Sequence, residues 1–186
     1  FDPAMSYYMP QTWTSDNTDA IERLSIQAGT SYVYPLSTMG AHISSTPNHQ
    51  VLRRTPIETR FNVAVFGLLG YELDLNKLSR FEKKVIKKQI EFYKKHRKLL
   101  QFGKFYRLRS PFDSNQCIWL VVSEDKNEAI LGYYQKLQQS NPPLENGMHE
   151  ITDSLILKSG DHTEKVILSC QLINADVKSG KLTETK

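Results

Sequence analysis

A tryptophan and two aspartates lie close together in Trp13-Thr14-Ser15-Asp16-Asn17-Thr18-Asp19. A carboxyl group beside an indole suits general acid/base work on a sugar, because the indole face stacks on a pyranose and its apolar body favours the protonated acid. A structural role competes with this interpretation, since aspartate is a preferred N-cap and an acid in the first turn complements the helix dipole. The residue types alone favour a helix cap for Asp16 and a helix-start role for Asp19.

Two other groups have suitable residue types but unsuitable spacing. His42 and His49 lie seven residues apart, which matches neither a helical i, i+4 pair nor the usual zinc pattern, and no cysteine or acid accompanies them. Cys117 and Cys170 fall in strand-like runs, where buried free thiols are normal, and they would pair only if those strands were neighbours. We therefore expect ordinary loop histidines, and neither a metal nor another cofactor.

Basic residues are concentrated in residues 77–109, where thirteen Lys and Arg accompany only Glu82 and Glu91. Lysine pairs recur on one side of a predicted helix, as a phosphate-binding surface would require. The solvated outer face of a helix in an α/β fold explains the same residues, and no nucleic-acid-binding motif accompanies them. Nucleic acid is therefore not the expected partner. A non-catalytic module that binds through the Lys-rich helix 80–100, or through the β-region after it, is the alternative function.

Composition excludes several classes of protein. With 186 residues, 39% of them hydrophobic, the chain is too apolar for a disordered protein, and its two cysteines are too few for a disulfide-stapled secreted module. Its longest apolar run, near residues 63–69, is far shorter than the roughly 18–20 residues that span a bilayer. No membrane partner is therefore expected. The chain begins with Phe1 rather than methionine, and we expect it to be a piece of a longer protein.

Helix and strand signals alternate before Gly103. The periodicity predicts helices over 20–28, closed by Gly29, from Thr55-Pro56 towards Gly70, and over 80–100, where Ser79 and Glu82 form a capping box. Short strands are expected at 31–34 and 71–73, and a long functional loop at 36–54. The apolar stripe expected on the third helix comprises Phe81, Val85, Ile86, Ile90, Phe92, Tyr93, Leu99 and Leu100.

After Gly103 the pattern changes to consecutive strands. Strand-like runs separated by turn residues occupy 104–109, 116–123, 128–137, 154–158 and 164–172. Alternating helices and strands indicate parallel βα units, whereas consecutive strands indicate an antiparallel sheet. Two or three βα units cannot bury both faces of a sheet, so the first half is expected to be the tail end of a larger α/β domain.

An ordered series of motifs resembles the α-galactosidases of glycoside hydrolase family 36 over roughly residues 1–143. The motifs are Phe1-Asp2-Pro3-Ala4-Met5, Tyr7-Tyr8, the run from Pro10 to Leu24, Gly29-Thr30-Ser31, Tyr34-Pro35, Met39-Gly40-Ala41-His42, Pro47-Asn48-His49-Gln50, Gly70-Tyr71-Glu72-Leu73-Asp74 and Phe105-Tyr106-Arg107-Leu108. A run this long and ordered is more specific than any single motif.

The resemblance implies a retaining exo-glycosidase that removes terminal non-reducing α-galactose from melibiose, raffinose and related oligosaccharides, with no cofactor. It implies that residues 1–103 are the C-terminal part of a (β/α)8 TIM barrel and that 104–186 form an antiparallel β-sandwich domain, with 145–186 atypical. The strands at 31–34 and 70–74 would be the last two of the barrel. A cytoplasmic location and a homo-oligomeric parent protein are further expectations.

The resemblance also changes the interpretation of Asp16, which matches the family's general acid/base in its Ser-Asp-x-Thr-Asp motif. Trp13 would line the galactose pocket, and Asp19 stays a helix-start residue. The family's nucleophilic aspartate lies in a Lys-x-Asp motif that this sequence lacks. We therefore expect a C-terminal portion that holds the acid/base half of the site and is inactive in isolation. Transfer of galactose to a sugar rather than to water remains an open alternative.

Overall fold

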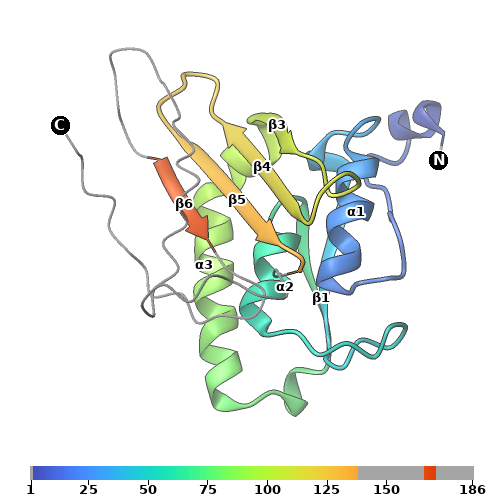
Figure 1. Ribbon diagram of the computed structural model, residues 1–186, viewed down its shortest axis with the longest axis vertical. Coiled ribbons are helices and arrows are strands. Elements are labelled where there is room, and N and C mark those ends of the chain that lie inside the picture. Colours follow the sequence, from blue (N-terminus) through green and yellow to red (C-terminus); the bar gives the residue numbers. More distant parts are fainter. Residues whose placement is uncertain (1, 138–165, 171–186) are drawn as a thin grey trace.

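The computed structural model describes residues 2–137 and the strand at 166–170, in the order shown in Figure 1. The predicted strand at 154–158 lies outside the described residues, as do most of residues 145–186. The helices are α1 (Ala20–Thr30), α2 (Ile57–Ala64) and α3 (Arg80–Phe102), with short 3-10 turns η1 (Pro3–Tyr7), η2 (Leu36–Thr38) and η3 (Leu75–Lys77). The strands are β1 (Gly40–Ser44), β2 (Leu68–Glu72), β3 (Lys104–Arg109), β4 (Gln116–Val122), β5 (Ala129–Gln135) and β6 (Val166–Cys170).

The first half consists of parallel strands joined by helices, as predicted. Strands β1 and β2 pair in parallel, and Thr12 forms an isolated parallel bridge to Met39 just before β1. Helix α1 connects the Thr12 segment to β1, and α2 connects β1 to β2. Because parallel strands end at the same edge, the segment that follows Thr12 reaches the edge at which β1 and β2 end.

The prediction of a strand at 31–34 is wrong. The strand that follows α1 along the chain is β1. Residues 31–34 form the turn after α1, where Tyr32 is 62% and Val33 68% exposed. The predicted loop at 36–54 instead contains η2 and β1. Small and polar residues alternate in β1 with the fully buried Ala41 and Ile43, because only one face of this strand packs against the helices.

Two helix ends also differ from the prediction. Gly29 lies inside α1 rather than after it, and a Cβ there would meet only the Phe112 ring at 3.6 Å. Helix α2 begins one residue late, with Pro56 as its N-cap, and ends at Ala64. The apolar run near residues 63–69, which suggested a longer helix, continues into β2. Successive side chains of this strand point to opposite faces of the sheet.

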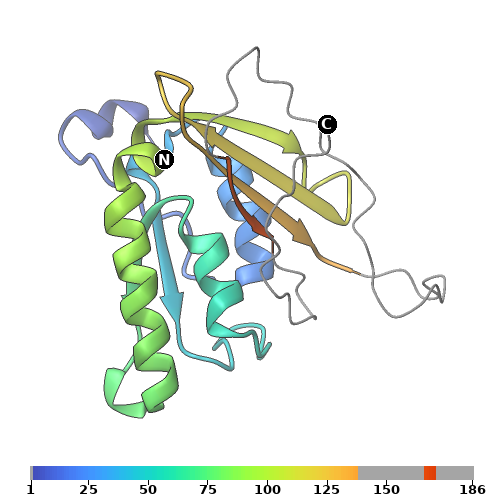
Figure 2. The ribbon, with the colours of Figure 1, turned by 90° about the vertical axis from the view of Figure 1, so that its left-hand side faces the viewer.

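The second half is a four-stranded sheet of order β3-β4-β5-β6. The pairs β3–β4 and β4–β5 are antiparallel, as predicted, whereas β5 and β6 pair in parallel. The sheet is therefore mixed rather than purely antiparallel, because β6 joins it beyond a long connection instead of a tight hairpin turn. Figure 2 shows this sheet at an angle to the helices of the first half.

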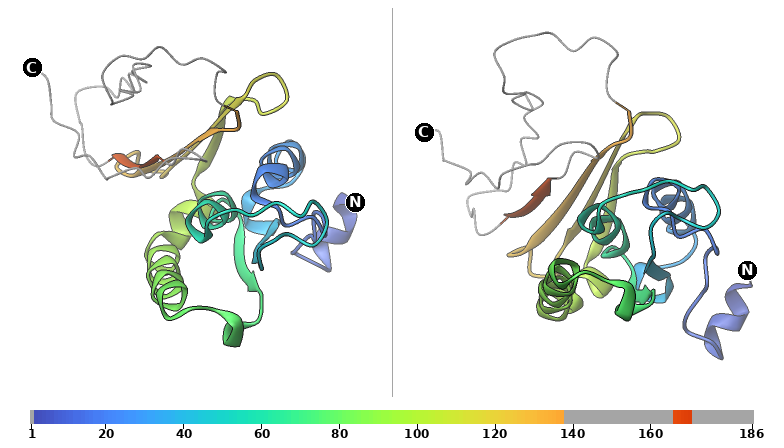
Figure 3. Two further views of the ribbon diagram at one scale, coloured as in Figure 1. Left: turned by 60° about the horizontal axis from the view of Figure 1, so that its bottom comes forward. Right: turned by 90° about the horizontal axis from the view of Figure 1, so that it is seen from below.

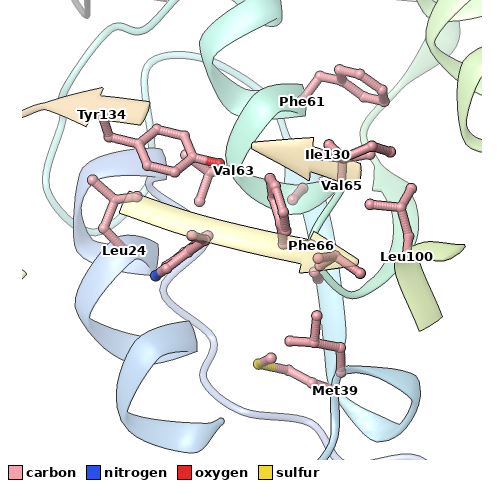
Figure 4. Packing of buried hydrophobic residues seen from close by; sticks show 14 of the residues in the cluster. Leu24, Met39, Phe61, Val63, Val65, Phe66, Leu100, Ile130 and Tyr134 are labelled. Carbon is pink, nitrogen blue, oxygen red and sulfur yellow. The ribbon is translucent and has the colours of Figure 1, made fainter. Parts of the chain in front are cut away.

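One cluster of buried hydrophobic residues contains side chains from both halves. In Figure 3, α2 lies between the two-stranded sheet and the four-stranded sheet. Phe66, which follows α2, packs edge-on against Trp119 of β4 with ring centroids 5.5 Å apart. The Tyr134 hydroxyl on β5 donates a hydrogen bond of 2.6 Å to the Asn62 carbonyl. Figure 4 shows this cluster, in which Leu24, Met39, Ile130 and Leu100 are also buried. The division into domains at residue 103 stays a prediction.

The capping box predicted at the start of α3 is confirmed. The Glu82 amide donates to the Ser79 hydroxyl at 3.1 Å, and the Ser79 amide donates to the Glu82 carboxylate at 2.9 Å. The stripe that faces the core comprises Ile86, Gln89, Tyr93, His96, Leu99 and Leu100, whereas Phe81 is 67% exposed, contrary to the prediction. The lysines Lys83, Lys84, Lys87 and Lys88 are exposed, as expected for a solvated outer face.

Replacing Ser79 with alanine should lower the free energy of unfolding by about 1 kcal/mol at pH 7. Hydrogen bonds from Ser79 lower the pKa of Glu82 below its usual value of 4.5. A lowered carboxyl pKa contributes stability above the usual value, and this contribution is lost as pH falls through the lower value of the folded state. The difference in thermal stability between the wild type and Ser79→Ala should therefore narrow as the pH falls below 4.5 but not vanish, because the hydrogen bond from the Glu82 amide to Ser79 Oγ does not titrate. A difference that stays constant down to pH 3 would show that the carboxylate plays no part.

Within the described residues, no helix is both long enough and apolar enough to cross a membrane.

Candidate functional site

The two aspartates of the predicted site have different roles in the structure. Asp19 is the N-cap of α1, and one of its carboxylate oxygens accepts hydrogen bonds from the amides of Ile21 and Glu22 at 3.0 and 3.1 Å. Its side chain is buried and forms an ion pair with Arg53. Asp16 caps no helix and is exposed. The helix cap predicted at Asp16 is thus wrong: the cap is Asp19, which was expected only as an acidic residue near the start of the helix.

The Asp16 carboxylate is held by Trp13. The indole Nε1 donates a hydrogen bond of 2.7 Å to Asp16 Oδ1, and the indole itself is 43% exposed. One carboxylate oxygen is thereby fixed by a donor. An aromatic surface and an anchored carboxyl group are thus presented together to solvent, beyond the point where the Thr12 segment runs beside β1.

His42 also contacts the indole. Its ring lies 4.6 Å from the Trp13 ring, centroid to centroid, in an edge-on arrangement. His42 is in the middle of β1 and is not a loop histidine. Its Nδ1 lies 3.8 Å from a carboxylate oxygen of Glu72, the last residue of β2. Burial lowers the pKa of His42, and the nearby Glu72 carboxylate opposes this effect without cancelling it. The imidazole is therefore neutral at pH 7.

Glycines leave the space that these two rings occupy. Gly70 pairs with His42 across the strands, and a Cβ at Gly70 would lie 2.6 Å from the imidazole. A Cβ at Gly40 would lie 3.4 Å from the Trp13 ring and 3.3 Å from the Thr12 carbonyl. Distances under 3.0 Å are too short for real contacts, so a larger residue at position 70 would displace His42.

Arg23 fixes the segment that carries Trp13 and Asp16. This buried guanidinium donates hydrogen bonds to Thr14 Oγ1 and to the Gly40 carbonyl, each at 2.6 Å, and to Gln27 Oε1 at 3.2 Å. Gln27 in turn donates to the Val63 carbonyl at 3.0 Å. Burial lowers the pKa of Arg23 to about 10, so it keeps its charge at neutral pH. Arg23 and Gln27 of α1 thus together link the site segment, β1 and the end of α2.

The loop after β1 is tied to the start of α1. The buried Asn48 donates to Thr18 Oγ1 at 3.3 Å, and Thr18 donates to Ser44 Oγ at 2.5 Å. Asn48 Oδ1 also accepts hydrogen bonds from the amides of Gln50 and Val51. These bonds hold the loop against the edge where the strands end. His49, which the sequence assigned to this loop, is exposed there.

Sequence reasoning found Trp13 and Asp16, which the structure brings together, but missed Arg23, Glu72 and the place of His42. The signal for His42 was the two-residue alternation of Gly40, His42 and Ser44 with apolar neighbours. Within the part of the chain that is described, no group of three or more metal-ligating side chains occurs. Cys117 is a free, buried cysteine whose burial raises its pKa to about 12, in agreement with the expected structural thiol.

Parallel strands joined by helices, with polar and aromatic side chains beyond their carboxyl ends, are typical of α/β enzymes. Comparison with known proteins narrows this class. Residues 1–103 match the family model described as melibiase. The chain is 58% identical over 144 residues to the α-galactosidase AgaA of Geobacillus stearothermophilus, covering 77% of this chain and 20% of that relative.

Solved structures of the same group have a similar fold. The family 36 α-galactosidase AgaB of Geobacillus stearothermophilus has a TM-score of 0.75 and 57% identity over 78% of this chain and 20% of its own. A variant of AgaA solved in complex with raffinose has the same TM-score and coverage at 56% identity. The chain belongs to the melibiase family, among the α-galactosidases of glycoside hydrolase family 36, and spans about a fifth of the length of the relatives it matches.

Proposed function

We propose that this chain supplies the acid/base half of a retaining α-galactosidase site. The observation that carries the proposal is the exposed Asp16 carboxylate, which caps no helix and is anchored by Trp13 at the edge where β1 and β2 end. In TIM-barrel enzymes the active site lies at this edge. The proposal includes the barrel itself, with residues 1–103 as its C-terminal part and 104–186 as a following β-domain.

In the first chemical step, Asp16 acts as the acid. Its carboxyl proton passes to the glycosidic oxygen while the bond from that oxygen to the anomeric carbon breaks. A second carboxylate, which this chain does not contain, forms an ester with the anomeric carbon. The hydrogen bond from Trp13 to Oδ1 favours Oδ2 as the oxygen that carries the proton. Trp13 also offers its exposed ring as one wall of the galactose pocket.

In the second step, Asp16 acts as the base. Its carboxylate removes a proton from a water molecule as the water oxygen bonds to the anomeric carbon and the ester opens. Two inversions give galactose with its α configuration retained. If a sugar hydroxyl replaces the water, the same proton transfer produces a new galactoside. Raffinose bound in a related structure supports galactosyl oligosaccharides such as raffinose and melibiose as substrates.

A chimera tests this function in a complete enzyme. In the chimera, the 144 matching residues of Geobacillus AgaA are replaced by the corresponding residues of this chain. We expect it to hydrolyse melibiose and 4-nitrophenyl α-galactoside but not 4-nitrophenyl β-galactoside. NMR should show α-galactose as the first anomer released. A chimera that unfolds cooperatively like AgaA but hydrolyses no α-galactoside, or that releases β-galactose first, would contradict the proposal.

A further inference from the structure

Trp13 and Asp16 do not hold their geometry by themselves. The segment around them is irregular, and the indole is nearly half exposed. The only contact that an aromatic ring of the described residues makes with the indole is from His42. The position of His42 therefore limits how far the indole can shift or rotate, and the indole in turn holds Asp16 Oδ1 at 2.7 Å.

His42 is itself fixed from two directions by β2. The imidazole lies over Gly70, where no Cβ is present and where one would approach the ring atoms Cδ2 and Nε2 at 2.6 and 2.7 Å. Glu72, two residues further along β2 and on the same face, lies 3.8 Å from Nδ1. The ring is thus confined between Trp13 and the backbone of β2, with one nitrogen directed at a carboxylate.

We infer that His42 and Glu72 are positioning residues for the Trp13–Asp16 pair. Glu72 orients His42, His42 packs against Trp13, and Trp13 fixes the carboxylate. This inference rests on the proposed function of Asp16. It adds that β2, through Glu72 and His42, controls the position of the Asp16 carboxylate in the segment before α1. Neither His42 nor Glu72 needs to touch the sugar for this effect.

The Gly70→Ala variant of the chimera tests this inference, because it displaces His42 without removing any polar group. Misplacing a catalytic group by about 1 Å costs up to roughly 10²-fold in rate. We expect Gly70→Ala to lower kcat for melibiose, whose leaving group needs the acid, about tenfold with little change in KM. Formation of the galactosyl ester from 4-nitrophenyl α-galactoside, measured as the nitrophenolate burst, should change less than about twofold, because this leaving group needs little protonation. Glu72→Gln, which preserves shape on an exposed residue, should show the same pattern at about threefold.

Gly67→Ala is the matched control. A Cβ at Gly67 would approach the Ala41 side chain at 2.8 Å, on the helix-facing side of the same region and away from His42. It therefore imposes a similar steric cost without moving the imidazole, and we expect equal effects on both substrates. A double-mutant cycle supplies the second check. In a His42→Ala background, Gly70→Ala should lower kcat for melibiose by less than about twofold, because no imidazole remains to be displaced.

The results separate this inference from the proposed function. If the unsubstituted chimera is active but Gly70→Ala and Glu72→Gln slow ester formation equally for both substrates, or slow melibiose no more than Gly67→Ala does, His42 and Glu72 do not position the acid. The same holds if Gly70→Ala costs as much without His42 as with it. If the folded, unsubstituted chimera is inactive, the proposed function itself fails.

Discussion

Asp16→Asn in the chimera is expected to reduce kcat for melibiose by about 10²–10⁴, the usual contribution of a general acid or base. The asparagine keeps the hydrogen bond from Trp13, because its amide oxygen can still accept it. It has no carboxyl proton to give to the leaving oxygen. Formation of the galactosyl ester from 4-nitrophenyl α-galactoside should be much less affected, since nitrophenolate leaves without protonation. Steady-state and burst-phase kinetics on the two substrates measure this contrast.

The control for this prediction is Asp74→Asn. Asp74 is another exposed aspartate, whose side chain accepts a hydrogen bond from the Asn76 amide at the start of η3. Because the Asp74 side chain contacts Asn76 and Lys77 rather than Trp13, Asp16 or His42, both substrates should be hydrolysed at the unsubstituted rate. An Asp16→Asn chimera in which ester formation slows by the same factor for both substrates, or in which kcat for melibiose is unchanged, would exclude Asp16 as the acid.

Arg23→Ala should have the largest effect on stability, a loss of about 3 kcal/mol in the free energy of unfolding. The substitution removes the charged donor from the Gly40 carbonyl, which keeps a longer bond from Thr14, and leaves Gln27 Oε1 without the Arg23 donor; it also opens space between α1 and β1. Unpaired buried polar groups and cavities are the main sources of large destabilisation. Urea unfolding of the 186-residue chain, followed by circular dichroism, measures the change.

Arg54→Ala is the matched control for Arg23→Ala. Arg54 is exposed, so its removal should change stability by less than about 0.5 kcal/mol. Arg23→Lys is informative as well. A lysine keeps the charge but lacks the planar fork that reaches Thr14 and Gly40 together, so much of the loss should remain. Equal midpoints for Arg23→Ala and Arg54→Ala would show that the buried guanidinium does not organise the site segment.

Local patterns predicted the features whose causes are local. Ser79 and Glu82 interact three residues apart, so their capping box and the start of α3 could be predicted from sequence. The residue types of segment 13–19 allowed an acid/base interpretation but favoured a helix cap for Asp16, and only the resemblance to the family indicated a candidate site there. The sequence could not predict which aspartate caps α1, because Asp16 and Asp19 are both suitable N-cap residues. That choice depends on where the helix starts, and hence on Arg53, which pairs with Asp19 from the loop after β1.

Features that depend on packing between distant segments were missed. The run at 31–34 has strand-forming residues, yet Tyr32 lies on the surface. The Arg107 guanidinium stacks over it, 4.4 Å from the centroid of the Tyr32 ring. Strand β1 has few strand-forming residues. It is a strand because Ala41 and Ile43 pack against the helices while His42 lies over Gly70. Neither partner is near in sequence, so the local pattern gave no sign of the pairing.

Rescue of the Asp16→Ala chimera by azide tests the central claim most directly. Alanine removes the base that activates water, so the galactosyl ester should accumulate from 4-nitrophenyl α-galactoside. Azide needs no base, and it should attack the anomeric carbon of the ester as the enzyme carboxylate leaves. We predict faster turnover with azide and an α-galactosyl azide product by NMR. No acceleration, or a β-galactosyl azide, would contradict the role of Asp16 as the acid/base of a retaining α-galactosidase.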